Sequence, residues 1–162
     1  MTSKRDFLAQ HPLFNELYDN EMDALVAITE ERDYPEGAVI AYQRDVGDSL
    51  YLVKSGLLLA LSVSQEGQIV SQSKQHYMTG HFFNDRWLFT PGIHPATVKA
   101  IKPSRVLIIK GEAFLKFIEK FKISLEYLGL TPEAQQEARR SRVALPKQYA
   151  PLKLQPDELV EW

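Results

Sequence analysis

Between Gly80 and Thr97 the chain reads Gly-His-Phe-Phe-Asn-Asp-Arg-Trp-Leu-Phe-Thr-Pro-Gly-Ile-His-Pro-Ala-Thr, and this stretch decides the fold. Asp85 is the type of residue that caps a helix or occupies its first turn. Trp87 and Leu88, which follow it closely, are of the type that fills a core. The stretch therefore predicts a short helical turn, followed by a loop that contains His94.

On both sides of this stretch, apolar residues recur in short runs with a period of two. Turn signals such as Pro35-Glu36-Gly37 and Ser55-Gly56 separate the runs. Many short strands separated by turns are typical of an antiparallel barrel or jelly roll, not of βαβ units. The predicted strands are residues 38–42, 50–53, 57–63, 69–73, 96–101 and 105–109.

Helical patterns flank the predicted strands. Apolar residues between Phe7 and Tyr18 recur at spacings of three and four. Asn20 followed by Asp23 predicts a capping box for a helix that runs to Ile28. A further helix is predicted from Gly111 to Phe121. We expect these helices to pack on the outside of the strands.

The composition is that of an ordinary globular domain. The 162 residues include 44% hydrophobic and 25% charged residues, with a formal net charge of -2, so the whole surface has no basic excess for nucleic acid. The absence of cysteine excludes disulfides, thiolate metal sites and a cysteine nucleophile. The N-terminus is polar and no apolar run is long enough to span a bilayer, so the sequence predicts a cytoplasmic protein without a membrane segment.

A second segment strengthens the prediction of the fold. From Tyr34 to Gly56 the chain reads Tyr-Pro-Glu-Gly-Ala-Val-Ile and later Gly-Asp-Ser-Leu-Tyr-Leu-Val and Ser-Gly. Together with residues 80–97, this segment resembles the cyclic nucleotide-binding domains of catabolite-activator-like regulators and protein kinase regulatory subunits. The resemblance covers residues 7–121 and implies a mainly β fold with flanking α-helices, an antiparallel jelly-roll barrel (double-stranded β-helix) of the cyclic nucleotide-binding type.

In that family, a phosphate-binding cassette reads Phe-Gly-Glu-x-Ala-Leu and, after a short loop, Arg-x-Ala-Thr. This chain keeps the same spacing with Asn84, Asp85 and His94 in place of the family's Gly, Glu and phosphate-holding Arg. Asn tolerates the left-handed backbone angles that Gly reaches freely, so we expect the turn to be kept. The resemblance implies that the following residues bind the ligand: Phe83, Asn84, Asp85, Arg86, Leu88, His94, Ala96 and Thr97.

The same resemblance implies a spatial arrangement for these residues. We expect Asn84, Asp85 and Leu88 to lie on a short helix or turn that faces His94 and Thr97 across a cleft. Two alternatives stay open at this point. His94 is either a ligand-binding residue or a loop residue without a ligand. Arg86 is either a substitute cation for the missing Arg or a side chain that points to solvent.

The presence of His94 weakens the implied phosphate site. A guanidinium is always charged and grips phosphate with two parallel donors, whereas an imidazole offers one donor to a given oxygen and is mostly neutral at pH 7. The loss of one or two charge-assisted hydrogen bonds predicts an affinity that is about tenfold to a hundredfold lower. Binding that depends on His94 is expected to strengthen as the pH falls.

Other chemistries lack their sequence patterns. No His-x-His pair with a following Glu is present, as a cupin metal site needs, and neither a Ser-His-Asp arrangement nor a phosphate loop is found. Arg139, Arg140 and Arg142 form a small basic cluster, which is more simply a solvated helix face than a DNA-binding element. The sequence therefore predicts no enzyme activity, no metal or cofactor, and no nucleic acid partner.

The segment after the predicted barrel departs from the family. Gly129-Leu130-Thr131-Pro132 is expected to break any helix that continues past Phe121, because Gly weakens a helix and Pro restricts the residue before it. We therefore expect the chain to lack the family's long dimerisation helix. Residues 1–130 are expected to form the domain with its flanking helices. Residues 131–162 are expected to form a C-terminal helix and a Pro-spaced tail or linker.

The function implied by the resemblance is that of a sensory or regulatory module. The implied ligand is cAMP or cGMP, bound weakly through the altered cassette. The alternative is a degenerate member of the family that binds no nucleotide and serves as a protein-interaction domain of a larger protein. Calorimetric titration with both nucleotides separates the two.

Overall fold

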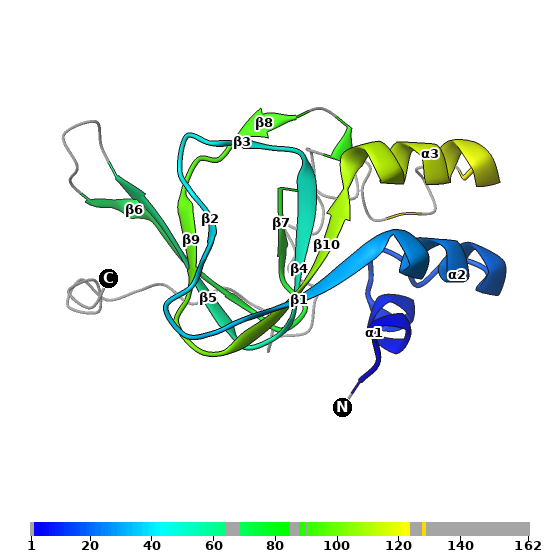
Figure 1. Cartoon of the computed structure of the whole chain (residues 1–162), viewed down its shortest axis with the longest axis horizontal. Helices are drawn as coiled ribbons and strands as arrows, with labels where there is room; N and C mark the ends of the chain where they lie inside the picture. The colour runs from blue at the N-terminus through cyan, green and yellow to red at the C-terminus, as the bar shows by residue number, and fades with distance from the viewer. Residues whose placement is uncertain (1, 64–68, 85–87, 90, 124–127, 129–162) are drawn as a thin grey trace.

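Within residues 2–63, 69–84, 88, 89, 91–123 and 128, which the computed structural model describes, the chain forms three helices and ten strands. The helices are α1 (Lys4–Gln10), α2 (Asp19–Ile28) and α3 (Gly111–Phe121). The strands are β1 (Thr29–Tyr34), β2 (Val39–Ala41), β3 (Val46–Gly47), β4 (Ser49–Ser55), β5 (Leu57–Val63), β6 (Ile69–Met78), β7 (Phe82–Phe83), β8 (Gly92–Ile93), β9 (Thr97–Ala100) and β10 (Ser104–Lys110). The helices lie together on one side of the strands (Figure 1).

The strands pair antiparallel in two four-stranded sheets and one short ribbon. The first sheet has the order β1-β10-β4-β7, the second has the order β2-β9-β5-β6, and β3 pairs with β8 in the ribbon. The six predicted strands and the predicted fold class are confirmed. The sheets form a roll without closing into a continuous barrel, which corrects that detail of the prediction.

Four strands of the structure are absent from the sequence prediction. β1 reads Thr-Glu-Glu-Arg-Asp-Tyr, and its middle is exposed and charged, so it has no alternating apolar pattern. It is an edge strand that pairs only with β10, and Arg105 Nε donates to the Asp33 carboxylate across this pair at 2.8 Å. β3, β7 and β8 have two residues each, too few for a periodic signal.

Alternation along β4 and β10 creates two apolar cores. Successive side chains of a strand point to opposite faces of a sheet. Leu50 and Leu52 of β4 face the helices, whereas Val53 faces the inside of the roll. In β10, Leu107 faces the helices and Val106 faces the inside of the roll. Both faces are buried at residues 50–53 and 106–109, which explains the continuous apolar runs in the middle of these strands.

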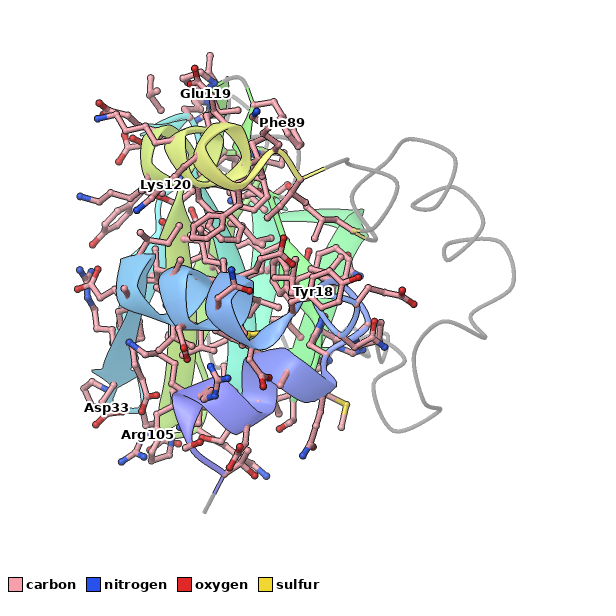
Figure 2. The ribbon with its side chains drawn as sticks, turned by 90° about the vertical axis from the view of Figure 1, so that its right-hand side faces the viewer. Tyr18, Asp33, Phe89, Arg105, Glu119 and Lys120 are labelled. Carbon is pink, nitrogen blue, oxygen red and sulfur yellow. The ribbon has the colours of Figure 1, made fainter. Side chains whose placement is uncertain are left out.

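We call the two cores the helix-side cluster and the roll-interior cluster. The buried members of the helix-side cluster are Leu8, Leu13, Phe14, Met22, Leu25, Leu50, Leu52, Leu88, Leu107, Ile109, Phe114, Phe117 and Leu128. The buried members of the roll-interior cluster are Ala41, Val53, Leu58, Ala60, Phe83, Val98, Ala100, Val106 and Ile108. The helices pack against the first sheet, with α2 between α1 and α3 (Figure 2), as expected from their apolar faces.

The ends of two helices differ from the sequence prediction. The predicted capping box of Asn20 and Asp23 is wrong: α2 begins earlier, and the Glu21 carboxylate accepts the backbone N–H of Tyr18 at 2.9 Å. α3 ends at Phe121 because Lys122 takes a left-handed conformation, with φ at 52°. Its N–H and that of Ile123 then bond carbonyls of the last helical turn.

Gly56 allows the turn between β4 and β5 to approach the start of β10. Its φ is +102°, and a Cβ at this position would lie 2.2 Å from Ser104 Oγ and 2.6 Å from Ser104 Cα. Ser104 Oγ in turn accepts the N–H of Leu57 at 3.1 Å. Both the backbone angle and the short separation require a glycine here.

Within the part of the chain that the structure describes, no helix is long and apolar enough to cross a membrane. The expected domain boundary at residue 130, the helix break at residues 129–132 and the tail over residues 131–162 lie outside the described residues. These remain predictions.

Candidate functional site

The predicted site residues lie along the chain between β7 and β9. Phe83 ends β7, His94 follows β8, and Thr97 begins β9. Asp85 and Arg86 lie outside the described residues, so their roles remain predictions. The ribbon of β3 and β8 joins this segment to the loop between β2 and β3, because Val46 pairs with Ile93 and Gly47 pairs with Gly92.

Asn84 and His94 are brought together although ten residues separate them. Asn84 has a φ of 64°, which confirms that it takes the left-handed conformation expected where the family has Gly. Its side-chain nitrogen Nδ2 lies 3.3 Å from His94 Nδ1. Because an amide nitrogen can only donate, Nδ1 is the acceptor and the ring carries its proton on Nε2. The arrangement favours a neutral imidazole.

The backbone of His94 is fixed by the loop between β2 and β3. Its N–H donates to the Asp45 carbonyl at 2.8 Å, and its carbonyl accepts the N–H of Arg44 at 2.8 Å. The side chain is buried, with 5% of its surface exposed. Burial lowers the pKa of His94 below its usual 6.5, and the charge of Asp45 opposes this effect with less weight.

Thr97 and Ala96 lie beside the same loop. The Thr97 hydroxyl Oγ1 accepts the backbone N–H of Gln43 at 2.9 Å. Ala96 is partly buried and packs against the roll-interior cluster. Ser62 of β5 donates its hydroxyl to the Pro95 carbonyl at 2.7 Å. The predicted residues His94, Ala96 and Thr97 are therefore held in place by strands and loops distant in the sequence.

Leu88 lies in a short helical turn, as expected. Its side chain is fully buried in the helix-side cluster, and its role at the site stays a prediction. The sequence pattern had a second interpretation for this residue, as part of the core, and that interpretation is confirmed. The segment crosses from the roll interior to the helices because Phe83, five residues earlier, belongs to the roll-interior cluster.

Aromatic rings line the roll interior next to these residues. Phe83 stacks on Tyr51 with ring centroids 4.9 Å apart, and its centroid lies 4.8 Å from that of the tilted Tyr77 ring. The His94 ring lies 6.4 Å from Tyr51. Burial raises the pKa of the Tyr51 hydroxyl. Tyr51 and Tyr77 were not predicted as site residues, although the position of Tyr51 in the alternation of β4 places it on the inner face.

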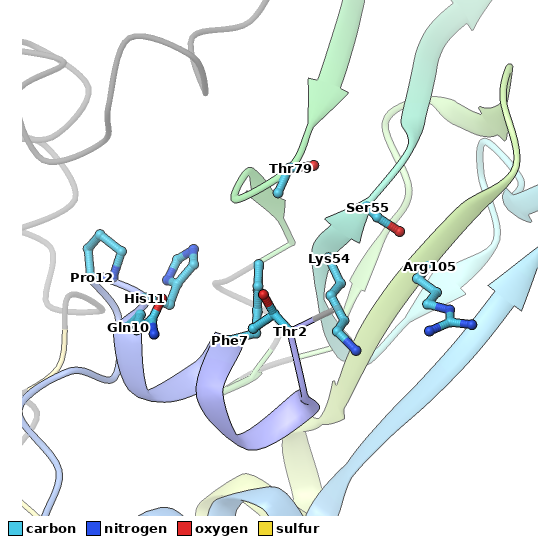
Figure 3. Close-up of a pocket in the computed structure, with 9 residues that line it drawn as sticks. All are labelled: Thr2, Phe7, Gln10, His11, Pro12, Lys54, Ser55, Thr79 and Arg105. Atoms are coloured by element: carbon cyan, nitrogen blue, oxygen red, sulfur yellow. The ribbon is translucent and has the colours of Figure 1, made fainter.

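This arrangement combines a hydrogen-bond donor with flat apolar surfaces. The imidazole Nε2–H and the Thr97 hydroxyl suit a ligand with oxygen acceptors, and the aromatic faces suit a planar ring. Among the described residues, no group of three His, Asp or Glu side chains could hold a metal ion. A pocket of about 290 Å³ lies elsewhere, between α1 and the ends of β4 and β10 (Figure 3).

The sequence of this chain is similar to a known domain family and to two known proteins. The sequence profile of the cyclic nucleotide-binding domain matches residues 31–121. The cyclic AMP receptor protein of Thermus thermophilus is 30% identical over 109 residues, which cover 67% of this chain and 50% of that protein. A cAMP-dependent protein kinase regulatory subunit of Colletotrichum orbiculare is 29% identical over 113 residues, which cover 70% of this chain and 28% of that protein. The chain thus spans half or less of these two relatives.

A solved structure extends the likeness to most of the chain. The N-terminal domain of a transcriptional regulator from Streptomyces coelicolor A3(2) has a TM-score of 0.65, with 87% of this chain and 96% of that chain covered. Because the sequence identity is 22%, this likeness shows the fold alone.

Proposed function

The chain belongs to the cyclic nucleotide-binding domain family, and we propose on that basis that it is a regulatory module that binds cAMP or cGMP weakly. The proposed ligand-binding residues are those of the altered cassette, with Asp85 and Arg86 among them. The proposed role is sensory and not catalytic. Asn84 and His94 are in contact where the family's cassette has Gly and Arg, and this is the observation on which the proposal depends.

Weak binding follows from the state of His94. The neutral ring offers one Nε2–H donor to a phosphate oxygen in place of the two charged donors of an arginine. We therefore expect an affinity about tenfold to a hundredfold below that of the same site with arginine. Tyr51, Phe83 and Tyr77 form the aromatic surface that would contact the base.

The proposed binding depends on pH with a definite sign. A bound phosphate raises the pKa of His94, so the affinity rises as the pH falls from that pKa toward the lower pKa of the free protein. Burial keeps the pKa of His94 in the free protein below 6.5, so the increase extends below that value. An arginine at this position stays charged throughout and removes the dependence.

Calorimetric titration tests this proposal with a matched pair of variants. His94→Arg should raise the affinity for cAMP or cGMP by about tenfold or more and flatten its pH dependence. Ile93→Arg adds the same charge one residue away, on a side chain that is 64% exposed, and should leave the affinity within about twofold. A nucleoside without phosphate should show no gain with His94→Arg. Equal affinities for wild type and His94→Arg would contradict the proposed role of His94.

The alternative function is that of a protein-interaction domain of a larger protein. Two observations favour it. The stacked rings of Tyr51, Phe83 and Tyr77 already occupy the roll interior. Val46 and Ile93, which pair across the β3–β8 ribbon, expose 74% and 64% of their surfaces. If neither wild type nor His94→Arg gives heat with either nucleotide, this alternative is preferred.

A further inference from the structure

His11 connects the N-terminal segment to the turn that precedes the cassette. It follows α1 directly, and its Nε2 lies 2.7 Å from the carbonyl oxygen of Gly80. Its Nδ1 accepts the backbone N–H of Leu13 at 3.1 Å. A carbonyl can only accept and an N–H can only donate, so both contacts require one ring state. That state is the neutral imidazole with its proton on Nε2.

The His11 ring is buried next to two aromatic side chains. Only 4% of the His11 surface is exposed. The ring centroid lies 5.8 Å from that of Phe7 in α1 and 5.9 Å from that of Phe82 in β7. Phe82 precedes Phe83 and Asn84 in the chain, so His11 packs against the strand that leads to the Asn84–His94 contact.

Gly80 is held from two sides. Its N–H donates to the Val53 carbonyl at 2.8 Å, and its carbonyl accepts from His11. Its φ of 91° places it in the left-handed region, where the chain turns from β6 into β7. The His11 ring is therefore one of the anchors that set where β7 begins.

Most of the charged side chains near His11 pair with other groups. His11 lines the pocket of Figure 3 together with Lys54 of β4 and Arg105 of β10. Lys54 pairs with Glu31 at 3.0 Å, and Arg105 pairs with Asp33 at 2.8 Å. α1 carries three charged residues. Lys4 donates to the Thr29 carbonyl, and Arg5 pairs with Asp23. Asp6 lies in the exposed first turn. None of these ion pairs includes His11. Burial lowers the pKa of His11, while the bond to Gly80 opposes this with less weight.

We propose that His11 is a positioning residue, whose neutral ring holds the N-terminal segment and the Gly80 turn together and so sets the position of β7. Protonation puts a proton on Nδ1, which then can no longer accept the N–H of Leu13. It also places a charge between the rings of Phe7 and Phe82. Acid therefore loosens the N-terminal segment and the turn together. This proposal does not depend on the proposed function.

Amide hydrogen exchange of the whole chain, without nucleotide, tests the connection. After correction for intrinsic exchange rates, wild type should lose protection by up to about tenfold between pH 7.5 and 5.5 in residues 7–14 and 79–83. The pKa of His81, next to Gly80, is also lowered by burial, so both proteins in this comparison carry His81→Asn, which does not titrate. In that background, His11→Gln keeps a donor for Gly80 but does not titrate, and it should remove this pH difference. His76→Gln, in β6 of the second sheet, replaces another buried histidine and should keep the wild-type response. An unchanged pH difference in His11→Gln would overturn the proposal.

A measurement on the unaltered protein covers the case in which His11→Gln does not fold. The ¹⁵N chemical shifts of the His11 ring should report the Nε2–H tautomer at pH 7.5 and a transition to the charged form below pH 6.5. A charged ring or an Nδ1–H tautomer at pH 7.5 would be incompatible with the two hydrogen bonds. Neither readout involves nucleotide, so these results stand apart from the titration that tests the proposed function.

Discussion

The helix-side cluster and the roll-interior cluster share β4 and β10 but are built from different side chains. The helix-side cluster consists of Leu, Ile, Met and Phe residues. The roll-interior cluster consists mainly of Val and Ala, with partly buried tyrosines and His94 beside it. Large apolar side chains make up the helix-side cluster. In the roll interior, smaller apolar residues lie beside the tyrosine rings and the His94 imidazole, which carry polar atoms. The comparison indicates that the helix side stabilises the fold, while the proposed site lies at the roll interior.

The largest expected effect separates the two clusters by their packing. Phe114→Ala should lower the free energy of unfolding by about 3–5 kcal/mol, because Phe114 is fully buried and contacts Phe89 and Phe117. Phe83→Ala should cost less, about 2 kcal/mol, because its neighbours Tyr51 and Tyr77 are partly exposed and water can enter the space. Urea unfolding measures both values. A larger loss for Phe83→Ala would reverse the comparison.

The second prediction concerns the frame of the roll. Gly56→Ala should lower the free energy of unfolding by about 3 kcal/mol or more, because the new Cβ meets the backbone of Ser104 as well as a strained φ. Gly37→Ala is the matched control: its φ is +90°, but no atom lies within 4 Å of the new Cβ. It should cost about 1–2 kcal/mol, from the backbone angle alone. Equal losses would show that the approach to Ser104 is relieved easily.

The third and smallest effect concerns acid. Burial lowers the pKa of His81 from 6.5 to about 4, and it also lowers the pKa values of His11 and His94. The unfolded chain then binds protons first, so stability is complete above pH 6.5 and falls as the pH drops toward 4. We expect a loss of about 2 kcal/mol from His81 over this range, measured by urea unfolding at several pH values.

A variant of His81 sharpens this prediction. His81 Nδ1 accepts the N–H of Met78 at 2.8 Å, and an asparagine side chain can accept the same bond without titrating. His81→Asn should therefore flatten the acid dependence while keeping the fold at pH 7.5. If the dependence is equally steep in this variant, groups other than His81 control it.

Local patterns in the sequence were sufficient for much of the fold. Six strands, the helix that ends at Phe121 and the left-handed Asn84 follow from periodicity, turn residues and the resemblance of the cassette. The exposed edge strand β1 was missed because its ladder with β10, and not an apolar pattern, keeps it extended. The resemblance gives the spacing of Leu88 but not the helix-side cluster in which its side chain is buried.

The sequence by itself determined six of the strands, the altered cassette and the presence of His94 where the family has a permanently charged arginine. Such features depend on residue type and on neighbours a few positions away. Only the tertiary structure decided that Asn84 contacts His94, that Tyr51 and Tyr77 enclose Phe83, and that His11 bonds Gly80 at a separation of 69 residues. These contacts join segments that are distant in the chain. Burial then lowers the pKa values of His11, His81 and His94, an effect that no local pattern in the sequence records.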